Sequence, residues 1–467
     1  MQHEKLSRSV ERTVLDNGAR VLSSFARNDT AAFGFGFNIG TIFDPPGLEE
    51  LFHMVEHLLL KAAPGYPQRR AMRILEKTGE CTAHTMQCQI LVPHLALVKG
   101  KKYRKNFRKA FRVLSKLVAQ PTFTEQEFLL ERDAVEREME ERASEPAWHA
   151  YDFLYQTLFG AENPIARKTV IDPQDVRRLS YETVLSYCQS LLEPNLVTVV
   201  GHGSLPHRSL VRAADAFFRR HEKSLKQKGV NPRHISLNHK QDIERSIRQC
   251  RLPDPLVLKP EPRQSDRLPA DLGGIALGCR LPSFKTKYRY ALEVLRCILG
   301  GHEIDGKSFL SGDVFYEVRE KRGHMYHPNV IDYEVSPLAG CFCICIQTNS
   351  SLLERVEETL LNLFRTYRRD GISQSIIEDA KARIETHFAI MASDYKFDFL
   401  EWMLDMEIGG APEEICEHVR NIRKTTRREV LEVIEKFFDP ETQIARTLVY
   451  PNSGEDPAAA PTKIHSD

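Results

Sequence analysis

The feature that most constrains the fold is an order of strand and helix patterns that occurs twice along the chain. Apolar residues alternate or cluster in some stretches, as in strands, and recur every three or four positions in others, as in helices. The expected strands are 13–23, 31–42, 81–98, 196–200, 274–280, 332–349 and 444–450, and the expected helices are 48–62, 67–78, 107–118, 125–145, 147–158, 172–192, 210–220, 287–299, 313–322, 352–370, 373–394 and 425–438. We therefore expect an α+β protein with two related halves, each an antiparallel sheet with helices packed on one face.

The length of the chain supports this division. Its 467 residues exceed what one hydrophobic core usually holds. The stretch 219–268 is rich in Lys, Arg, Gln, Asn and Pro and has few regular apolar positions, which is typical of a linker. We expect a catalytic domain over 1–220, a linker over 221–268, a second domain over 269–455 and a flexible tail over 456–467.

Charge and hydropathy argue against several kinds of partner. The 65 basic and 64 acidic residues leave a net charge of +1, so no overall basic field attracts nucleic acid. No run of 18 apolar residues is present, so we expect no membrane span. The N-terminal segment is polar and lacks the apolar stretch of a secretory signal, and a cytoplasmic location is the expectation.

The ten cysteines fit a reducing compartment. None of them forms a C-x-x-C pair. Cys341, Cys343 and Cys345 alternate with Phe342 and Ile344, which is typical of a buried strand with three small residues on one face. A thiolate metal site is the alternative interpretation of this run.

The strongest chemical signal is His53-Met54-Val55-Glu56-His57. On a helix, residues four apart lie on one face, so His53 and His57 can reach one cation, and Glu56 shares that face. Two imidazoles and one carboxylate form a common zinc site that leaves a position for water, and a nearby Glu can accept a proton from that water. An ordinary amphipathic helix with two histidines is the alternative. The spacing is the inverted form of the H-E-x-x-H zinc motif.

A third ligand is expected from the acidic helix at 125–145. Glu131 and Glu138 are seven residues apart and share one face, so one can bind the metal while the other orients a histidine. Glu136, Glu140 and Glu141 lie on the same helix, and the spacing alone leaves all five acids as candidates. A solvated acidic helix is the alternative.

The chain from Leu15 to about Gly201 resembles the catalytic half of the pitrilysin/insulinase zinc peptidases. The matching features, in order, are Leu15-Asp16-Asn17-Gly18, Arg20-Val21, Gly40, Asp44-Pro45, the H-x-x-E-H helix, Glu76, Gly79, Ala83-His84-Thr85, Pro121-Thr122-Phe123, Glu131 through Glu138, Asn163-Pro164 and Pro194-Asn195. The resemblance implies one zinc ion per subunit, bound by His53, His57 and Glu138, with Glu131 behind the ligands. It also implies hydrolysis of peptides or unfolded segments, with Glu56 as the base.

The second half carries a further resemblance to this family. Arg319 and Tyr326 keep the seven-residue spacing of the family's arginine–tyrosine motif, which holds the substrate carbonyl and stabilises its developing oxyanion. The resemblance also implies that the peptide adds a strand to a sheet edge formed by Thr82, Ala83, His84 and Thr85. A charged helix end followed by a strand is the alternative for the Arg319 motif.

The length resembles that of the short members of the family, such as the mitochondrial processing peptidase and related bacterial enzymes, which pair two chains around a closed chamber. One chain here holds both motifs, so a homodimer is expected, although pairing with a related subunit is an alternative. Three other functions stay open: a non-catalytic partner subunit, a peptidase dedicated to one precursor, and a metal-binding protein without hydrolysis.

Several positions depart from the family pattern. Phe52 replaces a small residue before His53, Thr82 replaces an Asn in the substrate strand, and the Gln87-Cys88-Gln89 run is unusual; all three concern substrate preference. Eighty residues separate His57 from Glu138, and the extra length falls on the basic stretch 101–112. This stretch is interpreted as a solvated helix face, with a docking patch for acidic peptides as the alternative.

Overall fold

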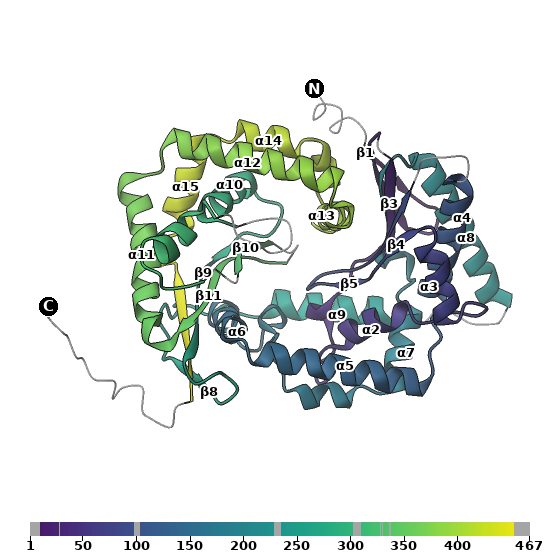
Figure 1. Cartoon of the computed structure of the whole chain (residues 1–467), viewed down its shortest axis with the longest axis horizontal. Helices are drawn as coiled ribbons and strands as arrows, with labels where there is room; N and C mark the ends of the chain where they lie inside the picture. The colour runs from purple at the N-terminus through teal and green to yellow at the C-terminus, as the bar shows by residue number, and fades with distance from the viewer. Residues whose placement is uncertain are drawn as a thin grey trace, which may run out of the picture.

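The computed structural model describes residues 10–27, 29–97, 103–227, 235–301, 310–326, 328, 330–335 and 338–452. The molecule has two halves, each built around one sheet (Figure 1). Within these residues, no helix is both long and apolar enough to cross a membrane.

The first sheet has seven strands, and its order is β1-β2-β7-β3-β6-β4, with β5 also paired to β6. Its strands are β1 (Val10–Val14), β2 (Arg20–Phe25), β3 (Thr30–Phe37), β4 (Gly79–Cys81), β5 (His84–Thr85), β6 (Ile90–Leu97) and β7 (Val197–Gly203). The strands β2 and β7 are parallel, whereas the other pairs are antiparallel.

The second sheet repeats this plan with five strands in the order β10-β11-β9-β12-β8. Its strands are β8 (Arg263–Ser265), β9 (Leu272–Leu281), β10 (Val330–Val335), β11 (Gly340–Asn349) and β12 (Ala445–Pro451). Here β12 is parallel to β8 and antiparallel to β9, as β7 is to β2 and β3. The two related α+β halves expected from the sequence are therefore confirmed, and each antiparallel sheet contains one parallel pair.

Most helices lie against one face of the sheet of their own half. In the first half these are α2 (Leu51–Leu59), α3 (Gln68–Glu76), α4 (Tyr103–Ala119), α5 (Glu125–Ala143), α7 (Tyr181–Ser190), α8 (His207–Gln227) and α9 (Ile235–Gln249). In the second half they are α10 (Arg289–Leu299), α11 (Leu353–Asp370), α12 (Gln374–Ser393), α14 (His418–Lys424) and α15 (Arg427–Phe437).

Two helices cross to the other half. Helix α6 (Pro146–Phe159) packs on β9, β11 and β12, and helix α13 (Lys396–Ile408) packs on β3, β6 and β7 (Figure 1). Each sheet is thus covered on its second face by a helix of the other half. Glycines permit both contacts, because a Cβ on Gly36 would overlap Leu404 of α13 and a Cβ on Gly274 would overlap the backbone of Pro146 in α6.

The stretch 221–268, expected to be a linker, is partly helical. It contains the end of α8 and all of α9, and Ile243 and Ile247 of α9 are buried in the core of the first half. The sequence did not indicate this helix, because most of its residues are polar and only a narrow apolar stripe faces the core. The expected tail at 456–467 lies outside the described residues.

The alternating cysteine run forms part of β11, as predicted. Cys341, Cys343 and Cys345 are buried against α6, whereas Phe342 and Ile344 point into the core of the second half. All ten cysteines are free thiols. The run is therefore a strand buried on both faces.

Candidate metal centre

The helix that carries the H-x-x-E-H motif begins at a buried carboxylate. Asp44 accepts hydrogen bonds from the backbone N–H groups of Glu50 and Phe52, each at 2.9 Å, and so caps the first turn of α2. Burial raises the pKa of Asp44 well above its usual value. The apolar face of α2 is buried in the core, whereas His53, Glu56 and His57 remain partly exposed on the other face. This orientation turns the motif out of the core.

The three predicted ligands converge. The Nε2 atoms of His53 and His57 are 3.2 Å apart. The carboxylate of Glu138, on α5, lies 3.3 Å from His53 Nε2 and 3.7 Å from His57 Nε2. Their ligand atoms all fall within 4.8 Å of one another. Ligands at about 2.1 Å from a tetrahedral ion are roughly 3.4 Å apart, so this donor set fits a four-coordinate zinc ion with one open position.

The other acids of α5 are placed differently. Glu131 lies behind His57, with Oε2 3.1 Å from Nδ1. Glu136 instead accepts hydrogen bonds from Arg177, outside the ligand cluster. Of the acids on α5 that the structure describes, Glu138 is the one grouped with both histidines.

Each histidine has a carboxylate on its far nitrogen. Glu50 Oε2 is 2.7 Å from His53 Nδ1, and Glu131 holds His57 Nδ1 in the same way. Lys61 forms an ion pair with Glu131. These carboxylates fix the rings so that both Nε2 atoms face one point, which is the usual arrangement behind metal-bound histidines.

Glu50 and Lys61 were not predicted as site residues. Glu50 stands just before α2 in a left-handed conformation, with φ of 64°. From the sequence we expected the helix to begin at residue 48, whereas α2 begins at Leu51, so a turn at Glu50 was not anticipated. The only sequence signal was its position three residues before His53.

The cluster concentrates negative charge around the two imidazoles. Burial opposes protonation of His53, but hydrogen bonds to Glu138 and Glu50 outweigh it and raise its pKa to about 10. The hydrogen bond with His53 lowers the pKa of Glu138. Burial would raise the pKa of Glu131, yet the contacts with Lys61 and His57 lower it. The site therefore favours a bound cation at the Nε2 atoms.

The proposed substrate strand lies at a sheet edge. Strands β4 and β5 both pair with β6. In the segment that joins β4 to β5, the backbone N–H of Thr82 donates to the carbonyl of Pro93 in β6 at 3.4 Å. Thr85 Oγ1 donates to Phe52 O in α2 at 3.4 Å, which ties this edge to the motif helix. No further strand of the described chain pairs with β4 or β5. Peptide binding along residues 82–85 stays a prediction.

The predicted Arg319 and Tyr326 contact each other in the second half. Arg319, in the π-helical turn Phe315–Glu320, donates to the carbonyl of Tyr326 at 2.6 Å and stacks 4.7 Å from the centre of its ring. Tyr326 is 76% exposed. Their action on a substrate stays a prediction.

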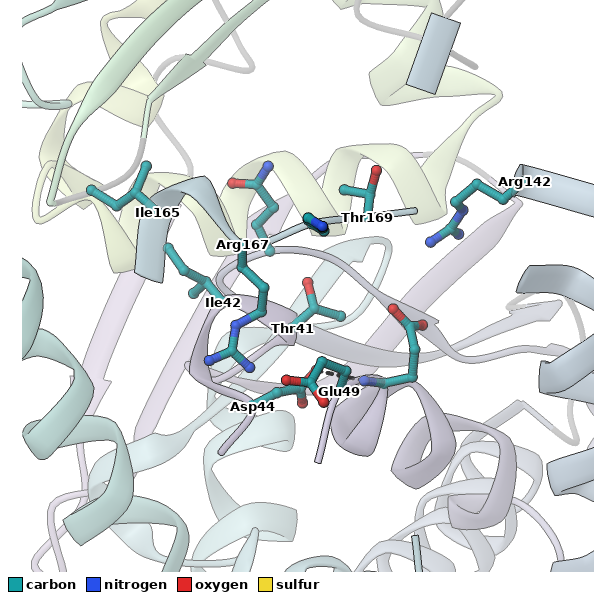
Figure 2. A pocket seen from close by; sticks show the side chains of 11 residues that line it. Thr41, Ile42, Asp44, Glu49, Arg142, Ile165, Arg167 and Thr169 are labelled. Carbon is teal, nitrogen blue, oxygen red and sulfur yellow. Dashed lines mark hydrogen bonds between the residues drawn. The ribbon is translucent and has the colours of Figure 1, made fainter. Parts of the chain in front are cut away.

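A small pocket of about 60 Å³ adjoins the centre through Glu50. Figure 2 shows Asp44 and Glu49 along the lower side of this pocket in the view, and Arg142 and Thr169 along the upper side. Because acids and bases both line it, the pocket selects no single charge.

These features define a two-part α+β chain with a cluster of two histidines and a carboxylate whose donor atoms could hold a metal ion. Residues 20–171, which include all the candidate ligands, match the model described as insulinase (peptidase family M16), and residues 178–384 match the model described as peptidase M16 inactive domain. The chain belongs to peptidase family M16, the insulinase family, as the resemblance predicted.

Several relatives and solved structures are similar to the chain. Cytochrome b-c1 complex subunit 1 of Rattus norvegicus is 23% identical over 71% of this chain and 65% of its own length. An uncharacterized zinc protease of Streptomyces coelicolor is 25% identical over 71% of this chain and 66% of its own length. The match therefore spans slightly less than two thirds of the length of each of these two relatives. The structure of a protease from Helicobacter pylori is similar with a TM-score of 0.77 and 16% identity, covering 95% of this chain and 99% of the other.

Proposed function

We propose that the chain is a zinc-dependent endopeptidase that hydrolyses peptides or unfolded segments. The observation that carries this proposal is the convergence of His53, His57 and Glu138, with the Nε2 atoms 3.2 Å apart and a carboxylate behind each ring. Such a donor set holds one zinc ion per subunit. The similarity to zinc proteases of Streptomyces coelicolor and Bacillus subtilis supports it.

The chain's own residues divide the work of hydrolysis. A zinc ion at these ligands supplies a Lewis acid and lowers the pKa of water. Glu56, on the exposed face of α2, accepts the proton of the attacking water and donates it to the leaving amine. Residues 82–85 align the peptide as an added strand. Arg319 and Tyr326 donate hydrogen bonds to the developing oxyanion.

We propose a homodimer in which Arg319 and Tyr326 of one subunit complete the site of the other. Both motifs are present in one chain, and Tyr326 is largely exposed. Sedimentation of the active enzyme tests this arrangement. An active monomer contradicts it. The cytoplasmic location stays a prediction from the sequence.

The peptidase function is tested by zinc content and cleavage of a pool of unstructured peptides. Glu56→Gln is expected to keep one zinc ion and to lose about 10²–10⁴-fold in cleavage rate. Glu141→Gln, an exposed residue of α5 outside the cluster, is the matched control and should cleave normally. The mechanism is wrong if Glu56→Gln binds zinc and cleaves as fast as the unaltered chain.

A non-catalytic subunit is the second candidate, because cytochrome b-c1 complex subunit 1 of Rattus norvegicus is among the relatives. A peptidase dedicated to one precursor is the third, since a probable mitochondrial-processing peptidase subunit beta of Arabidopsis thaliana is 26% identical over 44% of the chain. Zinc binding without cleavage of any peptide favours the former. Cleavage at one position in a few peptides favours the latter.

A further inference from the structure

A groove of about 760 Å³ runs between α4 and α8, and no residue of the metal centre lines it. Helix α4 packs on β6, and α8 packs on β2 and β7. Helix α13 covers the opposite face of this sheet, so the groove faces away from the second half (Figure 1). Its volume is in the range of ligand sites, about 300–1,000 Å³.

Aromatic rings form the floor. Phe107 and Phe111 lie one turn apart on α4, with ring centres 5.8 Å apart, and Phe217 lines the groove from α8. The rings of Phe111 and Phe217 both pack on Phe35 of β3, at 5.5 Å and 5.7 Å. The floor is therefore continuous with the core and held rigidly by it.

One wall is a row of four cations on α4. Arg104, Arg108, Arg112 and Lys116 recur every fourth residue, are exposed and line the groove. Residues four apart share a helix face, so the row extends about 18 Å. In the described part of the chain, none of the four forms an ion pair with a carboxylate; Lys116 lies over the ring of Tyr66 instead. Arg104, Arg108 and Arg112 belong to the basic stretch 101–112, for which the sequence left open a solvated helix face and a docking patch for acidic peptides; residues 101 and 102 lie outside the described residues.

The other wall repeats the pattern on α8. Arg208, Arg212 and Arg220 line the groove and are exposed. The Nε of Arg220 donates to its own helix at Ala216 O, 2.7 Å away. No Asp or Glu lines the groove. Seven cations thus gather at one place on a chain whose net charge is only +1.

We propose that this groove binds an acidic amphipathic helix of a partner protein. An apolar floor requires an apolar stripe, and cations on both sides require carboxylates on both sides of that stripe. The cations continue along the whole floor, so a lipid with one anionic head would satisfy one end only. A flat bilayer does not enter a concave groove. Charge along both walls therefore favours a helix of about 12 residues or more.

Binding is tested in the full-length Glu56→Gln variant, which avoids cleavage of the probe. The probe is a fluorescein-labelled helix of about 14 residues with a leucine stripe flanked by glutamates. One control peptide has lysines in place of the glutamates, and another has the same composition in scrambled order. Fluorescence anisotropy should show binding of the first peptide only, with weaker binding as salt rises, because surface charges are screened.

Charge reversal locates the binding. Arg108→Glu combined with Arg212→Glu alters one residue of each wall and should weaken binding at least about tenfold. Arg251→Glu combined with Arg428→Glu changes the net charge equally at exposed sites outside the groove and should change it less than about twofold. Equal melting temperatures of the two variants establish that both are folded.

Several results would overturn the proposal. The proposal is wrong if the scrambled peptide binds as well as the helical one. It is also wrong if reversing the charge of both walls leaves binding unchanged. Stronger binding of phosphatidylserine vesicles or oligouridine, lost on wall reversal, assigns the groove to lipid or to RNA instead. Because the assay measures binding without hydrolysis, failure of the peptidase function leaves this result unaffected.

Discussion

The two halves share a sheet topology but differ in the helix that follows the central strand. After β3 comes α2, which buries one face and leaves His53, Glu56 and His57 partly exposed. After β9 comes α10, nearly all of which is buried, including Glu293. The same frame therefore presents chemical groups in one half and encloses them in the other. Exposure of one helix face, rather than the fold, separates the two.

The contrast extends to the histidines. His57 Nε2 faces Glu138 beside a partly exposed site, whereas His418 Nε2 lies 3.0 Å from Glu293 Oε1 and is 1% exposed. Aromatic rings of Phe388, Trp402 and Tyr290 surround His418. Both halves thus contain an imidazole–carboxylate pair, and among the described residues the group of three converging ligands lies in the first half.

The largest expected effect is the loss of the centre in the first half. His57→Ala should abolish zinc binding and lower cleavage by at least about 10³-fold, because a bound metal ion contributes several kcal/mol to transition-state stabilisation. Metal analysis and cleavage rates measure both. His418→Ala should keep its zinc and its activity but lose about 2–4 kcal/mol of stability through the cavity it leaves. If His57→Ala retains zinc, the histidine cluster does not distinguish the first half from the second.

The next effect concerns the second half's share of catalysis. Tyr326→Phe should lower kcat by about 10²–10³-fold with little change in KM and full zinc content, because the lost hydroxyl stabilises only the transition state. Tyr316→Phe removes another exposed hydroxyl nearby and serves as the control. Unchanged kcat in Tyr326→Phe would leave the second half without a chemical role.

Local spacing predicted which of the candidate side chains share a helix face. The separation of four between His53 and His57 and of seven between Glu131 and Glu138 follows from helix geometry, so the sequence alone places these groups on shared faces. The position of Glu50 depends on a left-handed turn at the start of α2, which no periodicity reveals. The structure then brought α5 to α2 through contacts that lie far apart in the sequence.

Local periodicity likewise predicted individual strands and helices of the fold, but not which distant elements pack together. Alternation in Cys341–Cys345 identified a buried strand. The helical pattern of 147–158 identified a helix, but its own half offers no indication that it packs on the other sheet. The exchange of α6 and α13 depends on long-range packing, and it is the feature that sequence periodicity could not supply.

Lowering the pH should reduce the free energy of unfolding through His202, a buried histidine of the first half. His202 in β7 donates to Ala392 O at 2.7 Å, and burial lowers its pKa to about 4. Its folded pKa is below the ordinary 6.5, so the unfolded chain binds a proton first as pH falls. Stability is unaffected above pH 6.5, declines between pH 6.5 and 4, and loses about 3 kcal/mol in total. Chemical unfolding of His202→Gln, compared with the unaltered chain across this range, should show a flatter pH dependence. Parallel curves would contradict the assignment to His202.

The smallest expected effect tests the exchanged helices themselves. Gly274→Ala places a methyl group against the backbone of Pro146 in α6, whereas Gly36→Ala places it against the side chain of Leu404 in α13. A flexible side chain can move aside more easily than a backbone. We expect Gly274→Ala to cost about 3 kcal/mol and Gly36→Ala about 1 kcal/mol, within the usual range for overpacking. Denaturant unfolding measures both. Equal losses would mean that the two sheets accept their crossing helices with the same tolerance.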